Sequence, residues 1–253
     1  MEQQQLLLLM ITGVVAGFMN VMAGGGSLLT LPVMSEFLGL TGPVANGTNR
    51  IAVEAGAMNA VWGFRRLGFS DFKLSLTLAL CALPGAFVGA QVGCRLEGVL
   101  FKRVLAGVMI AVIILMAVNR KKRTLARENV VPTRTRSVIA HLCMVGAGCY
   151  GGFIQAGVGF ILIAILHKVL GLDLVRVNMH KVFIVGVYTV VALTVYAGQG
   201  NVAVVPGIAL AGGSVAGSWI GTHFAVKRGD RLIRICLNVA LAALVIKLLL
   251  SRA

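Results

Sequence analysis

Two clusters of polar residues lie at corresponding points of two long apolar stretches, and each could bind an oxyanion. The first cluster, Asn46-Gly47-Thr48-Asn49-Arg50, places amide, hydroxyl and guanidinium donors just before an apolar run. The guanidinium group of Arg50 donates hydrogen bonds in pairs, which suits an oxyanion. The alternative is that Arg50 marks a helix end and pairs with Glu54 one turn further on. The two roles are compatible if Glu54 orients Arg50.

The second cluster consists of Asn178, His180 and Lys181. Lys181 opens an apolar run, and His180 can be neutral or charged near physiological pH. A cation here would again favour an anionic solute. The alternative is an interfacial lysine whose aliphatic stem lets the ammonium group reach the lipid headgroups.

Glu54 is the only acidic residue well inside an apolar run. Carboxylates within a membrane are costly and usually functional. Glu54 could carry a proton, but as a fixed partner of Arg50 it would stay ionised and carry nothing. The sequence favours the fixed partner.

Glycines interrupt the two longest apolar stretches, Leu6 to Leu38 at Gly24-Gly25-Gly26 and Val138 to Leu170 at Gly157-Val158-Gly159. A membrane helix needs ~20 apolar residues, so each stretch is too long for one crossing and too short for two. Backbone groups freed at a break survive at that depth only where they line a cavity. The helix start after each break would offer N–H groups to an anion. The alternative role of the glycines is close helix packing.

These features together predict one substrate site with contributions from both halves of the chain. Glu54 is its orienting or coupling residue, and no catalytic or metal-binding residue is expected. The predicted substrate-binding residues are Asn20, Gly24, Gly25, Gly26, Ser27, Asn46, Thr48, Asn49, Arg50, Gln155, Gly157, Gly159, Asn178, His180 and Lys181.

The composition is that of an all-α polytopic membrane protein. The chain is 58% hydrophobic, and its mean hydropathy is +0.93, far above the usual share in a soluble domain. Eight apolar segments leave almost no chain for a soluble part, so residues 1–253 form a single transmembrane domain. The net charge of +15 sits in short loops, as the positive-inside rule expects, and does not indicate nucleic acid binding. No CxxC pair, H-E-x-x-H or G-x-S-x-G motif occurs, so neither an enzyme nor a metal site or cofactor is expected.

The two halves resemble each other, which predicts two four-segment repeats at 6–118 and 138–250, joined by a basic cytoplasmic linker at 119–137. Ala16-Gly17-Phe18 matches Gly151-Gly152-Phe153. Glycines at four-residue spacing recur later in each half, at Gly85, Gly89 and Gly93 and at Gly213, Gly217 and Gly221. Such ridges let membrane helices approach closely.

Charge distribution predicts that the broken segments enter the membrane and return on the same side. If all eight segments crossed, the basic residues would divide evenly between the two sides. A re-entrant fifth segment instead places most of them on the linker side, as the positive-inside rule requires. By the repeat, the first segment should re-enter too. Each half then crosses an odd number of times, so the repeats are inverted, a common transporter design.

Motifs in both halves resemble the TauE/SafE sulfite exporter family from about Gly13 to Leu249. In the first half they are Gly24-Gly25-Gly26-Ser27-Leu28-Leu29-Thr30-Leu31-Pro32, Ala45-Asn46-Gly47-Thr48-Asn49-Arg50 and Trp62-Gly63-Phe64-Arg65-Arg66. In the second half the motif is Tyr150-Gly151-Gly152-Phe153-Ile154-Gln155-Ala156-Gly157-Val158-Gly159-Phe160. Many members carry Gly-Gly-Gly and Gly-Thr-Ser in the second half, where this chain has Gly157-Val158-Gly159 and Met179-His180-Lys181.

The resemblance implies movement of a sulfur oxyanion, such as sulfite or an organosulfonate, across the cytoplasmic membrane. We therefore expect a multi-pass transporter of a small anion in the cell membrane, an exporter that works by alternating access. The alternatives are a passive anion channel and a membrane assembly factor that transports nothing. The expected partners are the anion and the lipid bilayer. The sequence leaves open the identity of the anion, the coupling ion, the direction of transport, the side of the N-terminus and whether the protein is a homo-oligomer.

Overall fold

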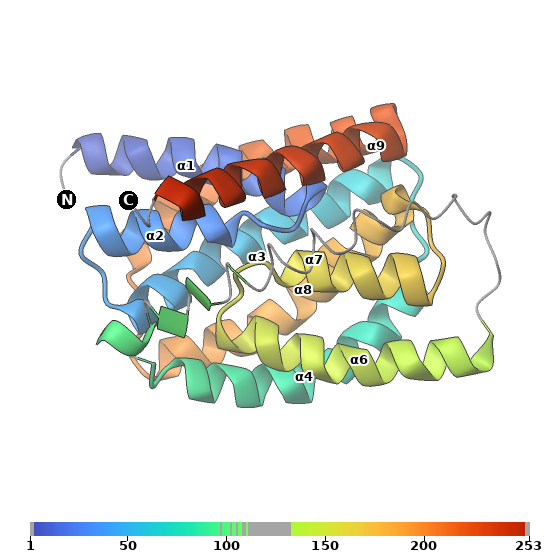
Figure 1. The fold of residues 1–253 in the computed structure, drawn as a ribbon, viewed down its shortest axis with the longest axis horizontal. Coiled ribbons are helices and arrows are strands. Elements are labelled where there is room, and N and C mark those ends of the chain that lie inside the picture. The colour runs from blue at the N-terminus through green and yellow to red at the C-terminus, as the bar shows by residue number, and fades with distance from the viewer. Residues whose placement is uncertain are drawn as a thin grey trace.

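The computed structural model describes residues 3–96, 98–101, 103–104, 106–107, 110 and 133–250, and in α9 it describes side chains as far as Arg228 and at Ile235. The predicted linker at 119–137 lies outside these residues as far as position 132. The described elements are all helical (Figure 1): α1 Gln3–Met22, α2 Ser27–Phe37, α3 Gly42–Arg66, α4 Phe72–Gly93, α6 Arg134–Phe153, α7 Val158–Ala164, the π-helix η1 Ile165–Val169, α8 Leu174–Gly198 and α9 Val204–Leu250.

Four of the described helices are long and apolar enough to cross a membrane. They are α1, α4, α8 and the Val204–Arg228 part of α9. A shorter apolar helix covers Val158–Val169. The expectation of a helical membrane protein is therefore confirmed.

Each long apolar stretch folds as a full-length helix followed by a short one, with the break at the glycines. The first stretch changes from α1 to α2 through Gly24, which has φ +80°. The second changes from α6 to α7 through Gln155 (φ +60°) and Gly157 (φ +74°). Glycine adopts this left-handed backbone without steric cost, which explains why the helices end there. Among the described residues, Gln155 is the only residue other than glycine that has a positive φ.

The two broken stretches run in opposite senses along the bundle. In Figure 1, α1 and α2 run antiparallel, and so do α6 and the α7–η1 pair, which start from the other end of the long axis. Whether these pairs re-enter a membrane, and whether the halves are true repeats, stays a prediction.

Glycine ridges join helices from different halves. α4 packs against α6, and α9 packs against α1. A Cβ atom at Gly85 or Gly89 would overlap a backbone carbonyl oxygen of α6, and one at Gly213 or Gly217 would overlap a carbonyl oxygen of α1. These positions tolerate no side chain, so the four-residue glycine spacing marks close helix contacts.

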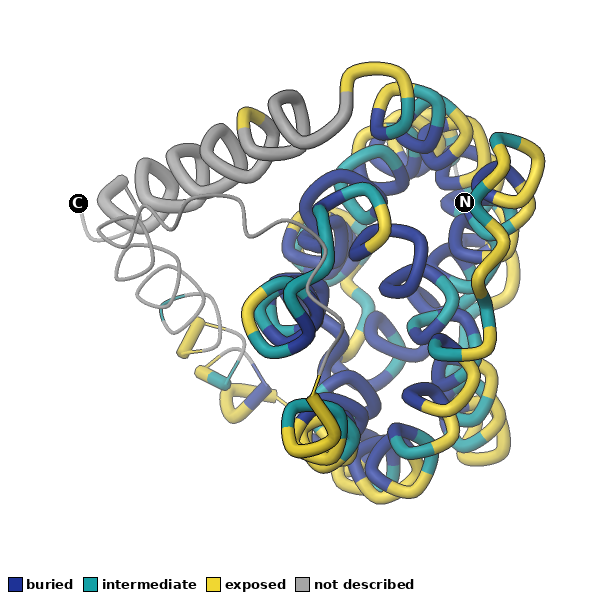
Figure 2. Tube along the Cα trace, turned by 90° about the vertical axis from the view of Figure 1, so that its right-hand side faces the viewer, coloured by how far each residue is buried: buried dark blue, intermediate teal, exposed yellow. Residues whose placement is uncertain are grey.

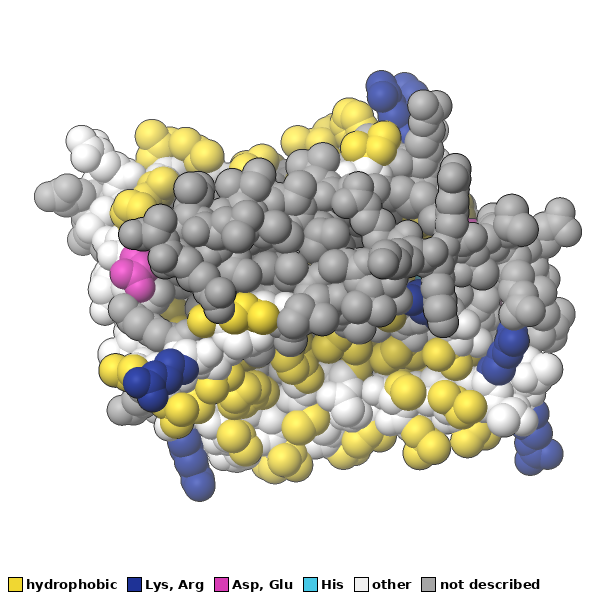
Figure 3. Space-filling view, viewed as in Figure 1, with side chains coloured by type: hydrophobic (Ala, Val, Ile, Leu, Met, Phe, Trp, Pro, Cys, Tyr) yellow, Lys and Arg dark blue, Asp and Glu magenta, His cyan; other side chains and the backbone are white. Residues whose placement is uncertain are grey.

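The surface of the bundle is apolar where a membrane would surround it. Figure 2 shows buried residues gathered inside the bundle and exposed residues around its outside. Large exposed side chains include Leu80, Phe87, Leu142 and Trp219. In the view of Figure 3, Lys and Arg side chains lie mainly toward the two ends of the long axis, with hydrophobic side chains between them. This pattern matches the hydrocarbon band and its two polar borders.

Candidate functional site

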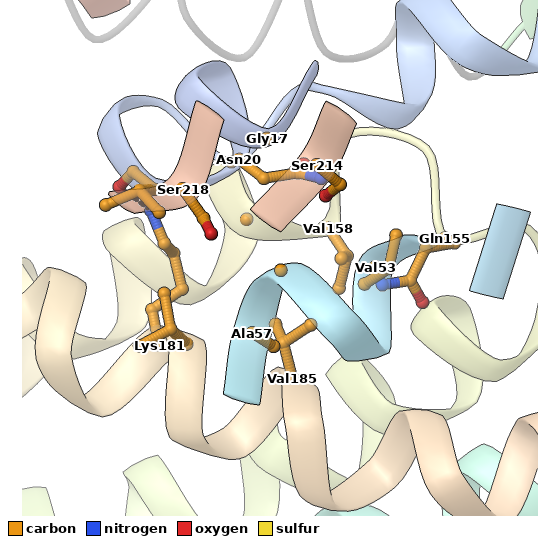
Figure 4. A pocket seen from close by; sticks show the side chains of 15 residues that line it. Gly17, Asn20, Val53, Ala57, Gln155, Val158, Lys181, Val185, Ser214 and Ser218 are labelled. Atoms are coloured by element: carbon orange, nitrogen blue, oxygen red, sulfur yellow. Dashed lines mark hydrogen bonds between the residues drawn. The ribbon is translucent and has the colours of Figure 1, made fainter. Parts of the chain in front are cut away.

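The two helix breaks meet at the centre of the bundle. A Cβ atom at Gly24 would overlap the Cα atom of Gly159, and one at Gly159 would overlap the Cα atom of Gly24. A pocket lies beside this contact (Figure 4). Its lining comes from both halves: Gly17, Asn20, Val21, Gly24, Val53, Gly56, Ala57, Gln155, Val158, Gly159, Lys181, Val182, Val185, Ser214 and Ser218.

Five predicted site residues line this pocket: Asn20, Gly24, Gln155, Gly159 and Lys181. Figure 4 shows Lys181 at one end and Gln155 at the other, with apolar side chains between them. The sequence therefore identified polar residues at both ends. The remaining predicted residues do not line the pocket, and the structure gives most of them other partners.

Lys181 closes the carbonyl end of α1. Its side chain is buried, with 1% exposed. The ammonium Nζ donates to the backbone oxygen of Val21 at 2.7 Å and to Oδ1 of Asn178 at 2.7 Å. A cation is favoured at a helix C-terminus, where carbonyl dipoles point outward. Lys181 is thus an internal cation and not an interfacial one that reaches the headgroups.

Arg50 performs the same role at the end of α6. Its side chain is fully buried. The guanidinium group donates to the backbone oxygen of Gly151 at 3.2 Å, to that of Gly152, and to Oε1 of Gln155 at 3.3 Å. Its Cζ atom lies 4.6 Å from the centroid of the Tyr196 ring. Arg50 does not line the pocket, but its hydrogen bond to Gln155 connects it to a residue that does.

The expected pairing of Arg50 with Glu54 is not formed. The hydrogen bonds of Arg50 go to α6 and Gln155, and its Nε atom has no partner in the described residues. The Oε2 atom of Glu54 is buried and also has no hydrogen-bond partner there. The helix end of α6, brought close by the fold, offers two carbonyl groups at once and replaces the local carboxylate.

Several predicted residues stabilise the first break, and among them only Asn20 also lines the pocket. Asn49 donates to Oγ of Ser27 at 2.9 Å and accepts from Oγ1 of Thr30 at 2.6 Å, which ties α3 to α2. Asn20 accepts from the backbone N–H of Gly26 at 2.8 Å. A Cβ atom at Gly25 would lie 2.9 Å from the Phe160 ring. Gly25 thus packs against Phe160, and Gly26 and Ser27 connect the start of α2 to α1 and α3.

Other predicted residues hold helices together further from the pocket. Asn46 donates to the backbone oxygen of Phe153 and to the hydroxyl of Tyr196, both at 2.7 Å. Thr48 accepts from the backbone N–H of Ala203 at 2.9 Å. The Nδ1 atom of His180 lies 2.7 Å from Oγ of Ser75. Gly157 precedes α7, and Asn178 acts through Lys181.

Two buried cations, Lys181 in the pocket lining and Arg50 next to Gln155, are held by neutral groups. Lys181 and Arg50 bond to carbonyl and amide oxygens, and no carboxylate pairs with either in the described part of the chain. Carbonyl dipoles satisfy the donors without cancelling the charge. In a low-dielectric interior, such a charge attracts an anion far more strongly than it would in water. The arrangement can bind an anion. It offers no group of three His, Cys, Asp or Glu residues for a metal ion among the described residues.

Sequence reasoning missed part of the pocket lining. Ser214 and Ser218 reach the pocket from α9, and Gly17 and Gly56 let helices approach it. Ser218 accepts from Nδ2 of Asn59 at 2.9 Å. The signal was present, since each serine follows a glycine of the α9 ridge, but a ridge alone does not reveal which of its sides faces the pocket.

The fold and this buried polar centre define a helical integral membrane protein. The family model described as "Sulfite exporter TauE/SafE" matches residues 9–248. The chain therefore belongs to the TauE/SafE family and is a membrane transporter of that family.

Curated relatives carry matching names at low identity. A "Probable membrane transporter protein ORF9" of Sinorhizobium sp. is 25% identical over 245 residues, covering 96% of this chain and 92% of the relative. A "Probable membrane transporter protein" of Haemophilus influenzae is 24% identical over 90% of this chain and 88% of its own length. The "Probable membrane transporter protein YfcA" of Escherichia coli K12 is 23% identical over 95% of this chain and 88% of its own length. These names are consistent with a protein that is not an enzyme. No solved structure matches the chain.

Proposed function

We propose that this protein moves a small anion, most suitably a sulfur oxyanion such as sulfite or an organosulfonate, out of the cell across the cytoplasmic membrane. One observation carries the proposal. A pocket at the meeting point of two broken helices contains a buried ammonium group, and a buried guanidinium group lies one hydrogen bond away. The family description, sulfite exporter, supplies the class of anion.

Lys181 is the residue that meets the anion. Its Nζ atom already has two acceptors, so an oxyanion entering the pocket takes the place of one of them or adds a third. Gln155 extends the positive field of Arg50 toward the other end of the pocket. Ser214 and Ser218 supply hydroxyl groups on the α9 side. Charge-assisted hydrogen bonds of this kind favour an oxyanion over a neutral solute.

Inverted repeats would let the pocket open to either side in turn. Each short helix of a broken pair would be a re-entrant element, and the contact between Gly24 and Gly159 would be the point about which the halves rock. The pairs α1–α9 and α4–α6, packed through glycines, would be the interfaces along which the two halves move.

Counterflow in proteoliposomes tests the proposal. Vesicles loaded with unlabelled sulfite, thiosulfate, methanesulfonate, sulfate or phosphate receive a trace of the labelled anion outside. A transporter concentrates the label transiently, and the uptake saturates. A passive channel conducts without counterflow. An assembly factor shows neither flux nor thermal stabilisation by any of these anions, since only a ligand of the folded state stabilises it.

A further inference from the structure

Glu54 lies on α3 beside the pocket but forms no part of its lining. Its sequence neighbour Val53 and Ala57, three residues on, both line the pocket. Its Oε1 atom lies 4.0 Å from the position that a Cβ atom would take at Gly186, so the carboxyl group faces α8. Its Oε2 atom is buried and has no hydrogen-bond partner in the described residues. A buried ionisable group inside a membrane protein is energetically costly and indicates a function.

Neither buried cation holds this carboxyl group. Arg50, one turn earlier on α3, donates to the carbonyl end of α6 and to Gln155. Lys181 donates to Val21 and Asn178. Both cations are thus engaged at helix ends. A carboxylate fixed by a cation stays ionised, whereas one without such a partner can bind and release a proton.

Among the described residues, Tyr188 of α8 is a titratable group that interacts electrostatically with Glu54. The hydroxyl of Tyr188 is buried near Gln155, and Tyr188 also interacts electrostatically with Arg50 and Tyr150. Tyr150 donates its own hydroxyl hydrogen to the backbone oxygen of Ala156.

The other helices packed against α3 bring no cation to Glu54 among the described contacts. α9 contacts α3 through Ser214 and Thr222, whose hydroxyl groups do not titrate. α1 contributes Asn20, and α2 carries its Glu36 near its exposed far end. His180 on α8 is engaged with Ser75 of α4. Glu54 is therefore the one carboxyl group of the described residues beside the pocket.

We propose that Glu54 binds the proton that is transported together with the anion. The proposal rests on the anion transport proposed above. A proton from water adds to the carboxylate of Glu54 when an anion occupies the pocket, and both leave on the opposite side, where the carboxyl group returns its proton to water. One proton accompanies one monovalent anion, so each cycle is electroneutral. Export is then driven by the outward concentration gradient of the anion, and the same cycle runs inward when the proton gradient is the larger force.

Electrostatics gives the reason for the coupling. An anion in the pocket and an ionised Glu54 repel each other, and the low dielectric of the interior makes that repulsion large. A proton on Glu54 removes it. Anion binding and proton binding therefore favour each other, and by linkage the effect is reciprocal. Without the proton, the affinity of the pocket for the anion would be lower.

The first experiment uses the unmodified protein in proteoliposomes that contain a pH indicator dye. Methanesulfonate is the probe, because its charge is fixed at one across the pH range of the assay. We expect inward methanesulfonate flux to acidify the lumen, and an alkaline lumen to drive accumulation, by up to about tenfold per pH unit for a one-to-one ratio. Methanesulfonate flux that moves no protons would overturn the proposal. Absence of counterflow for any anion would instead overturn the proposed transport itself.

The second experiment assigns the proton to Glu54. Glu54→Gln keeps the shape of a protonated carboxyl group. We expect it to retain methanesulfonate counterflow and to lose both lumen acidification and accumulation driven by the pH gradient. The matched control is Glu36→Gln, the same change at an exposed position of α2, which should behave as the unmodified protein does. Accumulation by Glu54→Gln equal to that of the control contradicts the assignment.

A third variant covers the case in which Glu54→Gln does not fold. Glu54→Asp retains the carboxyl group and should keep proton-coupled uptake, with a shifted pH profile of methanesulfonate affinity. A folded Glu54→Asp protein that transports methanesulfonate but no longer acidifies the lumen would contradict the assignment.

Discussion

The carbonyl ends of α1 and α6 are built alike and used differently. Each receives a buried cation from the second long helix of the other half, Lys181 of α8 at α1 and Arg50 of α3 at α6. Arg50 satisfies two carbonyl groups and an amide and lies over the Tyr196 ring, away from the pocket. Lys181 satisfies one carbonyl group and one amide and lines the pocket. The comparison separates a cation that is engaged away from the pocket from one that lines it.

The largest effect is expected from loss of the α6 cation. Arg50→Met should lower the free energy of unfolding by about 3–5 kcal/mol, because several buried acceptors lose their donor at ~1–3 kcal/mol each. Thermal unfolding in detergent measures this. The control is Arg66→Met, an exposed arginine stacked 3.7 Å from the centre of the Trp62 ring, for which a loss of at most ~1 kcal/mol is expected. Similar melting temperatures for the two variants would deny Arg50 its structural role.

The glycine contact between the two breaks should show the next largest effect. Gly24→Ala adds a Cβ atom against the backbone of Gly159 and strains a residue at φ +80°, at a cost of about 2–4 kcal/mol. Gly25→Ala meets only the end of the Phe160 ring and should cost ~1 kcal/mol or less. Membrane abundance, melting temperature and flux per molecule are measured together. If Gly25→Ala lowers the melting temperature and the flux more than Gly24→Ala does, the two breaks do not meet at Gly24 and Gly159.

Loss of the α1 cation should harm transport more than stability. Lys181→Met should weaken anion binding by roughly ten- to a hundredfold, because a charge-assisted hydrogen bond contributes about 1.5–3 kcal/mol. The cost in stability should be smaller than for Arg50→Met, since fewer acceptors are left without a donor. Affinity is read from thermal stabilisation by sulfite and methanesulfonate. Anion affinity that falls more in Arg50→Gln than in Lys181→Met would reverse the comparison.

The smallest effect is expected at the link between Arg50 and the pocket. Gln155→Gly removes the amide that connects Arg50 to the pocket. Glycine suits the left-handed backbone at φ +60°, so the free energy of unfolding should change by no more than ~1 kcal/mol. Anion affinity should fall a few-fold. Gln155→Asn, which tolerates the same backbone, is the control for the amide group. An unchanged affinity in Gln155→Gly would show that Arg50 does not act on the pocket.

The sequence by itself determined the class of the protein, the family and the positions of the helix breaks. These follow from local physics: a long apolar run needs a membrane, glycine ends a helix where the backbone turns left-handed, and glycines every four residues allow close packing. It also identified Lys181, Asn20 and Gln155 as polar residues of the pocket.

Only the tertiary structure decided which partners the charged residues have. From sequence alone Glu54 was the natural partner for Arg50, because it is one turn away, yet the guanidinium group donates to the carbonyl end of α6 and to Gln155. The contact of Gly24 with Gly159 and the serines that α9 adds to the pocket likewise join segments more than a hundred residues apart. Local patterns carry no information about such pairs, because the free energy that selects them arises only when whole helices pack.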